Sequence, residues 1–140
     1  MLKICVIDGQ GGGIGSALIK KLKEEYGEDI EVIALGTNAI ATSQMMKARA
    51  NKGATGANAI IKTSRTAQVI IGPIGIILAN AMMGEVTPEM AAAVADSPAK
   101  KILLPLSQEN VEIAGLTPEP LPHLIDEIVK TKIKEMMHHV

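Results

Sequence analysis

At 140 residues, 47% of them hydrophobic and 21% charged, the chain is the right size for one domain with a full core, spanning 1–140, and too short for a separate catalytic domain. Its formal net charge of -1 and its single aromatic residue provide neither a basic face nor a base-stacking platform. Nucleic acid is therefore not an expected partner.

Taken in chain order, the hydrophobic pattern predicts five strands separated by helices. The strands are expected at 3–8, 30–36, 67–73, 101–106 and 111–116, and the helices at 16–26, 39–50, 57–67, 75–84, 87–97 and 121–137. The first four strands are continuous runs of Val, Ile and Leu, which is typical of parallel strands covered on both faces. We therefore predict a three-layer, Rossmann-like α/β domain with a mostly parallel sheet of about five strands in the order 3-2-1-4-5.

Three features of the sequence favour a cytoplasmic protein. The chain turns polar at Asp8, too soon for the apolar region of a signal peptide, and the single Cys5 cannot form an internal disulfide. The longest apolar run, 69–83, contains glycine and proline and is shorter than the roughly 18 to 20 residues that span a membrane. No membrane partner is expected.

The first strand runs into a glycine-rich loop, "DGQGGGIGSA", that opens a helix. Unpaired backbone N–H groups and the positive end of a helix favour an anion there, and glycines let it come close to the backbone. The predicted ligand-binding residues of this loop are Asp8, Gly9, Gln10, Gly11, Gly12, Gly13, Ile14, Gly15 and Ser16. Ser16 could instead be a simple helix N-cap.

The spacing Gly9-x-x-x-Gly13-Ile14-Gly15 resembles the fingerprint of the short-chain dehydrogenases, which implies a seat for a dinucleotide pyrophosphate. At the end of the second strand, Thr37 and Asn38 stand where an acid that holds the ribose is expected. They could still hydrogen-bond a ribose. The Tyr-x-x-x-Lys pair of that family is missing, so dehydrogenase activity is not expected.

A second resemblance covers more of the chain. The segments "DGQGGGIGSA", "IEVIALGTNAIA" and "NKGATGANAI" follow one another as in the nucleotide-binding half of the tubulin-like GTPases, which implies that Thr55, Gly56 and Asn58 also face a nucleotide. Asn58 could instead cap the helix that follows. The Gly-Gly-Gly-Thr-Gly phosphate loop of that family is replaced by "GPIGIILAN", so GTP hydrolysis and filaments are not expected.

Over nearly its full length, the sequence resembles a family of short, uncharacterised bacterial proteins that share the opening "DGQGGGIG" with "IIGPIGI" and "GEVTPEMA" further on. This resemblance implies the Rossmann-like fold and brings no established activity.

Three hypotheses follow for the function. The preferred one is a binding or regulatory module for a nucleotide-like small molecule, with NAD(P) or a purine nucleotide as candidate ligands, with or without Mg²⁺. The second is a small metal-assisted enzyme in which Asp8 acts on a phosphorylated substrate; Asp8 could equally tie down the glycine loop through backbone N–H groups. The third is a structural or partner-binding protein. No catalytic set and no dedicated metal site can be assigned.

The predicted helix 75–84 is apolar nearly all round, since Ile76, Ile77 and Leu78 are followed by Met82 and Met83. Such a helix must be buried on more than one side. We therefore expect a homo-oligomer, most simply a dimer, unless the last helix covers this surface.

Overall fold

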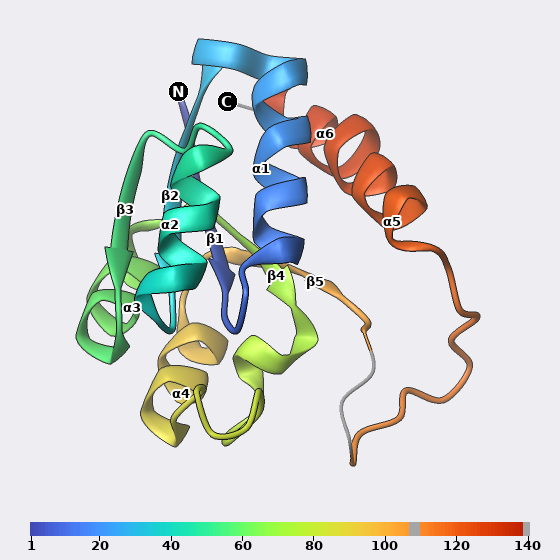
Figure 1. Cartoon of the computed structure of the whole chain (residues 1–140). Helices are drawn as coiled ribbons and strands as arrows, with labels where there is room; N and C mark the ends of the chain where they lie inside the picture. Colours follow the sequence, from blue (N-terminus) through green and yellow to red (C-terminus); the bar gives the residue numbers. More distant parts are fainter. Residues whose placement is uncertain (107–109, 139–140) are drawn as a thin grey trace.

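The computed structural model describes residues 1–106 and 110–138. A parallel five-stranded sheet forms its centre, in the order β3-β2-β1-β4-β5 (Figure 1). The strands are β1 (Leu2–Asp8), β2 (Ile30–Gly36), β3 (Lys52–Thr55), β4 (Val69–Pro73) and β5 (Lys100–Leu104). The predicted α/β class and the 3-2-1-4-5 order are confirmed. The strands predicted third and fourth, at 67–73 and 101–106, are β4 and β5, because the unpredicted β3 precedes them in the chain.

Helices cover both faces of the sheet, which makes three layers (Figure 1). On one face lie α1 (Gly13–Tyr26), α2 (Ala39–Lys47) and a C-terminal helix made of α5 (Leu121–Glu127), a π-helical turn (Ile128–Lys132) and α6 (Ile133–Met137). On the other face lie α3 (Ala57–Thr63) and α4 (Pro88–Asp96). Short 3₁₀ turns occupy Gly27–Asp29, Ser64–Thr66 and Ile74–Ile77. Among the residues described, no helix is both long enough and apolar enough to cross a membrane.

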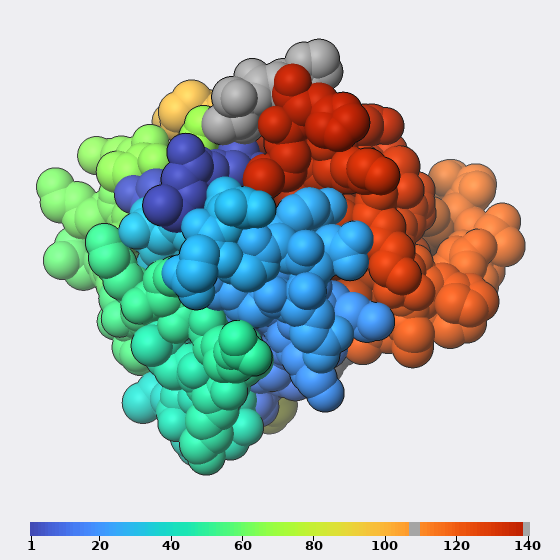
Figure 2. Space-filling view, turned by 90° about the horizontal axis from the view of Figure 1, so that it is seen from above, coloured from blue at the N-terminus to red at the C-terminus, as the bar shows by residue number. Residues whose placement is uncertain are grey.

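The C-terminal helix packs beside α1, as the adjoining red and blue surfaces in Figure 2 show. Its buried residues Ile125, Ile128, Val129 and Ile133 belong to the same core as the inner face of α1. Tyr26, at the end of α1, donates its hydroxyl to the carbonyl of Val129 inside the π-helical turn. The predicted amphipathic closing helix is therefore present and anchored by the one tyrosine.

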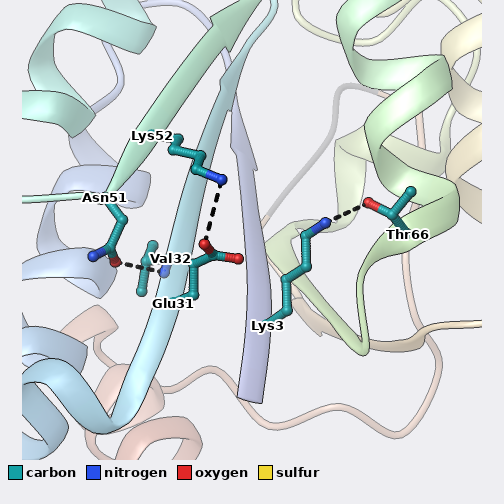
Figure 3. Close-up of polar contacts among 6 residues, drawn as sticks. All are labelled: Lys3, Glu31, Val32, Asn51, Lys52 and Thr66. Atoms are coloured by element: carbon teal, nitrogen blue, oxygen red, sulfur yellow. Dashed lines mark hydrogen bonds and ion pairs between the residues drawn. The ribbon is translucent and has the colours of Figure 1, made fainter. Parts of the chain in front are cut away.

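The edge strand β3 is absent from the sequence prediction. Its "KGAT" sequence is short and carries no apolar alternation, so polar groups rather than buried side chains attach it to β2 (Figure 3). The Asn51 side chain accepts a hydrogen bond from the Val32 N–H at 2.8 Å, and Lys52 pairs with Glu31 at 3.5 Å. Figure 3 also shows Lys3 donating to Thr66 at 2.8 Å, a contact that joins β1 to the turn before β4.

Two predicted elements are wrong. The strand expected at 111–116 is not formed: after an isolated bridge at Val111, residues 112–120 are exposed, so no neighbouring strand or helix covers their apolar side chains. The helix expected at 75–84 is also absent. After the 3₁₀ turn Ile74–Ile77, the chain winds through turns with positive φ at Asn80, Met82, Met83 and Gly84, a backbone that a helix cannot adopt.

Candidate functional site

The glycine loop joins the end of β1 to the start of α1. The Gly12 N–H donates to the Gly9 carbonyl at 2.9 Å, and Gln10 and Gly12 have positive φ values of 51° and 73°. Gly12 is the N-cap of α1 and has no side chain to cap it. The Ser16 hydroxyl donates back to the Gly12 carbonyl at 2.6 Å, so the expectation that Ser16 is the N-cap is wrong.

Asp8 lies beneath this loop and is only 3% exposed. Its Oδ1 accepts the Gly9 N–H at 2.8 Å and its Oδ2 accepts the Gly15 N–H at 2.7 Å. Burial raises the pKa of Asp8 above its usual 3.8, an effect opposed by these backbone hydrogen bonds and supported by repulsion from Glu85. Of the two roles left open by the sequence, these contacts favour the one that ties down the loop.

The five glycines of the loop fall into two groups. A Cβ added at Gly9 would meet Thr37 Oγ1 at 2.5 Å, one at Gly12 would meet the Ala41 backbone at 2.8 Å, and one at Gly15 would meet Met45 Sδ at 2.5 Å. A Cβ added at Gly11 or Gly13 would meet nothing within 4 Å. The first group is glycine because the chain is crowded there, and the second group faces open space.

Thr37 and Asn38 lie beside the glycine loop, as predicted from their place at the end of β2. The Thr37 N–H donates to the Asp8 carbonyl at 3.0 Å. The Asn38 side chain caps α2 by accepting the Ala41 N–H at 2.8 Å, and its amide donates to the Gln10 carbonyl at 3.0 Å. The ends of β1 and β2 therefore form one polar surface.

The loop after β3 sits at the same edge of the sheet, since Asp8 pairs in register with Gly36 and Gly36 pairs with Thr55. The Thr55 hydroxyl donates to Thr42 at 2.7 Å, a contact with α2 rather than with the glycine loop. Gly56 is the N-cap of α3, with φ of 97°, and Asn58 is exposed in its first turn. The expectation that Asn58 caps this helix is wrong.

Glu85 is the site residue that the sequence analysis misses. It lies in the turns before α4, and its Oε1 accepts hydrogen bonds from Thr37 Oγ1 at 2.6 Å, Asn38 Nδ2 at 2.8 Å and the Gln10 N–H at 2.8 Å. These bonds, that of Thr37 above all, hold the pKa of Glu85 below its usual 4.5. Glu85 lies within the "GEVTPEMA" segment that carries the family resemblance, but a lone glutamate between Gly84 and the Thr87 cap of α4 belongs to no recognisable ligand-binding spacing, so its place in the site could not be predicted.

Reactive groups are few near this surface. Within 1–106 and 110–138, no three His, Cys, Asp or Glu side chains are grouped as metal ligands. Cys5 is buried in β1, and burial raises the pKa of its thiol to about 11, so it is protonated at neutral pH.

A shallow depression of about 750 Å³ lies elsewhere, between α3 and α4. Its lining is mostly small or apolar and includes three charged residues, Arg65, Glu89 and Asp96. It shares no residue with the glycine loop. The surface formed by the glycine loop, Thr37, Asn38 and Glu85 is therefore the candidate site.

Comparison with known proteins gives a family and a fold. A family model described as a domain of unknown function (DUF3842) matches residues 3–137. The curated proteins include no match. Among solved structures, the chain is similar to a dodecameric FMN-dependent Ubix-like decarboxylase from Escherichia coli O157:H7, with 16% identity, a TM-score of 0.53, and 97% of this chain and 94% of that chain covered.

The chain is also similar to a universal stress protein in complex with cAMP, with 14% identity, a TM-score of 0.42, and 74% of this chain and 98% of that chain covered. At these identities, the likeness to the decarboxylase confirms the α/β fold alone, and the likeness to the stress protein carries no argument.

Proposed function

The chain belongs to the DUF3842 family, a domain of unknown function, and we propose that it is a binding or regulatory module for a nucleotide or dinucleotide phosphate. The proposal places the phosphate against the glycine loop at the start of α1. It places the rest of the ligand along Thr37 and Asn38.

The observation that carries the proposal is the open space at Gly11 and Gly13. Neither glycine has a positive φ, and a Cβ at either position would touch nothing within 4 Å. The fold therefore has no need of glycine at these two positions. A bare backbone there has a physical use if a ligand approaches it closely.

The electrostatics of the loop support the same ligand class. Gly13 begins a 14-residue helix with no acidic residue in its first turn, so its positive end is not neutralised by its own side chains. Asp8 takes the N–H groups of Gly9 and Gly15 from below, while in the described chain no protein acceptor binds the N–H groups of Gly11 or Gly13. Two donors at a positive helix end thus face the solvent.

A binding module is preferred to an enzyme because the chemistry around the loop is sparse. Asp8 is only 3% exposed beneath the glycine loop, and its two oxygens hold the Gly9 and Gly15 N–H groups, so a metal could reach this carboxylate only if the loop opened. A thiol with a pKa of about 11 is no nucleophile at neutral pH.

The test is a thermal-shift screen of the wild-type chain with NAD, NADP, ATP, GTP and FMN, with and without Mg²⁺. FMN is included because a protein of similar fold is FMN-dependent. A ligand at 100 times its dissociation constant should add about 2.7 kcal/mol of stability. Absence of any shift would favour the structural or partner-binding hypothesis.

Matched variants connect the shift to the loop. Gly11→Val and Gly13→Val should keep the melting temperature of the free protein within a few degrees and weaken ligand binding by about tenfold or more, which is about 1.4 kcal/mol. Lys20→Ala, an exposed change on the same helix, should leave binding unchanged. Wild-type affinity in both valine variants would contradict the proposed position of the phosphate.

A further inference from the structure

The candidate site holds an acid that comes from an unexpected element. In dinucleotide-binding sheets, an acid at the end of the second strand holds the ribose hydroxyls. Here β2 ends with Thr37 and Asn38, and the carboxylate of Glu85 reaches both of them from the turns that follow β4, at 2.6 and 2.8 Å. Glu85 thus brings a carboxylate to the end of β2, which has no acid of its own, although Glu85 lies almost 50 positions further along the chain.

The two oxygens of Glu85 are used differently. Oε1 accepts all three hydrogen bonds, from Thr37, Asn38 and the Gln10 N–H, and these fix the carboxylate in place. In the part of the chain that the structure describes, no group donates to Oε2, and the side chain is only half-buried. A carboxylate can accept about four hydrogen bonds, so acceptor capacity remains for donors on a ligand.

The charge at this position selects between kinds of ligand. No lysine or arginine among the described residues forms an ion pair with Glu85, and the buried carboxyl of Asp8 adds negative potential nearby. Hydroxyl donors suit this environment. A second phosphate placed against Glu85 would meet like charge with no cation to offset it, whereas the phosphate proposed at Gly11 and Gly13 has the positive end of α1 beside it.

The backbone that carries Glu85 is held in a specific conformation. Asn80 donates its N–H to the Val86 carbonyl at 2.7 Å, which closes the turns, and Met82 and Met83 adopt positive φ between them. Met82 lies so close to Gly9 that a Cβ added to Gly9 would meet its Sδ at 2.6 Å. Non-glycine residues adopt this conformation only at an energetic cost, which the surrounding contacts must offset.

We propose that Glu85 is a specificity-determining residue of the candidate site: its Oε2 accepts hydrogen bonds from the adjacent 2′- and 3′-hydroxyls of a ligand ribose, so that the site binds nucleotides with a free diol and rejects those with a 2′-phosphate. This inference rests on the proposed function. It adds the chemical feature that the ligand must present and the residue that reads it.

The experiment compares three small probes by isothermal titration calorimetry: AMP, 2′-deoxy-AMP and adenosine 2′,5′-bisphosphate. Wild-type protein should bind AMP about tenfold or more tightly than either of the others. Glu85→Gln should weaken AMP binding and reduce its preference over the bisphosphate by about tenfold, because a neutral amide no longer repels the 2′-phosphate. Glu89→Gln, an exposed glutamate on α4, should behave like wild type.

A second variant keeps the test decisive if Glu85→Gln fails to fold. Glu85→Asp retains the charge and shortens the side chain, so it should lose affinity for AMP and still reject the bisphosphate. If the largest thermal shift in the wild-type screen comes from a guanine nucleotide, GMP, 2′-deoxy-GMP and guanosine 2′,5′-bisphosphate replace the adenine probes.

Three outcomes would overturn the inference and can be told apart. Equal wild-type affinity for the three probes, or a shift with FMN alone, would reject the role of Glu85 while the proposed phosphate site stands. If Glu85→Gln binds all probes and inorganic phosphate more tightly than wild type, the Glu85 carboxylate instead blocks the anion site. If the wild-type screen gives no shift with any nucleotide, the proposed function fails first and the inference fails with it.

Discussion

Asp8 and Glu85 are neighbouring carboxylates whose pKa values are displaced in opposite directions. Asp8 is buried, so its charged form is disfavoured and its pKa is raised, while Glu85 is half-exposed and its pKa is lowered by the hydrogen bonds it accepts. By linkage, the stability that Glu85 contributes is present above about pH 4.5 and is lost as the pH falls through its lowered folded value. The stabilising contribution of Asp8 has the other sign: it is present below about pH 3.8 and is lost as the pH rises through its raised value.

This difference gives a pH-dependent prediction for Glu85→Gln. At neutral pH the variant should be less stable than wild type, because its amide replaces a carboxylate that accepts three hydrogen bonds. Urea unfolding from about pH 7 to about pH 2 should show the two free energies of unfolding converging in acid, as wild-type Glu85 becomes protonated. Curves that stay parallel to low pH would mean that the hydrogen-bonded charge contributes nothing.

Those residues of the candidate site that directly follow an apolar strand could be predicted from the sequence. Asp8 and the glycines stand next to one another after an apolar strand, and Thr37 and Asn38 follow the next strand, so parallel pairing alone brings them together. Glu85 could not be found this way. Its position depends on turns with positive φ at Asn80, Met82 and Met83, which no residue type there favours except Asn80.

Among the elements, apolar runs predicted the four strands whose sequences contain consecutive Val, Ile or Leu and failed for β3, which has none. β1, β2 and β4 are continuous runs of buried residues, and each lies where it was expected. β3 is mostly exposed and held by polar contacts, so its sequence lacks a hydrophobic signal. In 75–84 the apolar residues suggested a helix, but Ile76 is buried by contact with the α4 side of the core while Met83 is 91% exposed.

The turns of 78–86 allow a comparison of two methionines. Met83 has a φ of 56°, so Met83→Gly should leave stability unchanged or raise it by up to about 1 kcal/mol, because glycine adopts this conformation without the Cβ penalty. Met46 is 38% exposed within α2, so Met46→Gly should lower stability by about 1 kcal/mol. Urea unfolding of both variants checks the opposite signs.

A loss of stability in Met83→Gly equal to that in Met46→Gly would contradict the strained conformation of this segment. Met46 also packs over Gly53 and is less exposed than Met83, so its loss includes side-chain contacts, and the sign of the change at Met83 is the diagnostic result.

On the scale of the whole molecule, the strand order places the candidate site. After β1 the chain adds β2 and β3 on one side of β1, and then β4 and β5 on the other side (Figure 1). The strand order therefore reverses between β1 and β4, and the segments that follow these two strands diverge there. Ligands of open α/β sheets bind at such a reversal, beyond the carboxyl ends of the strands. Glu85, which follows β4, and Asn38, which follows β2, meet across it.

The expectation of a dimer now depends on a different segment. Within 75–84, Ile76 is buried and offers nothing to a partner, and Met83, at 91% exposed, is the one large apolar side chain of that segment in the exposed class. Residues 112–120 run outside the body of the domain, with Ile113 and Leu116 41% and 45% exposed (Figure 1). The exposed side chains of Ile113 and Leu116 could contribute to the roughly 800 Å² per subunit that a stable interface buries.

We therefore expect the wild-type chain to sediment as a dimer at micromolar concentration, with 112–120 at the interface. Replacing Ile113 and Leu116 together by Glu should shift the protein to a monomer, because two charges would be buried without partners. The same replacement of Ile40 and Met46, which are exposed on α2, should leave the dimer intact. A wild-type monomer would reject the dimer itself, whereas a dimer lost only in the α2 variant would move the interface to that helix.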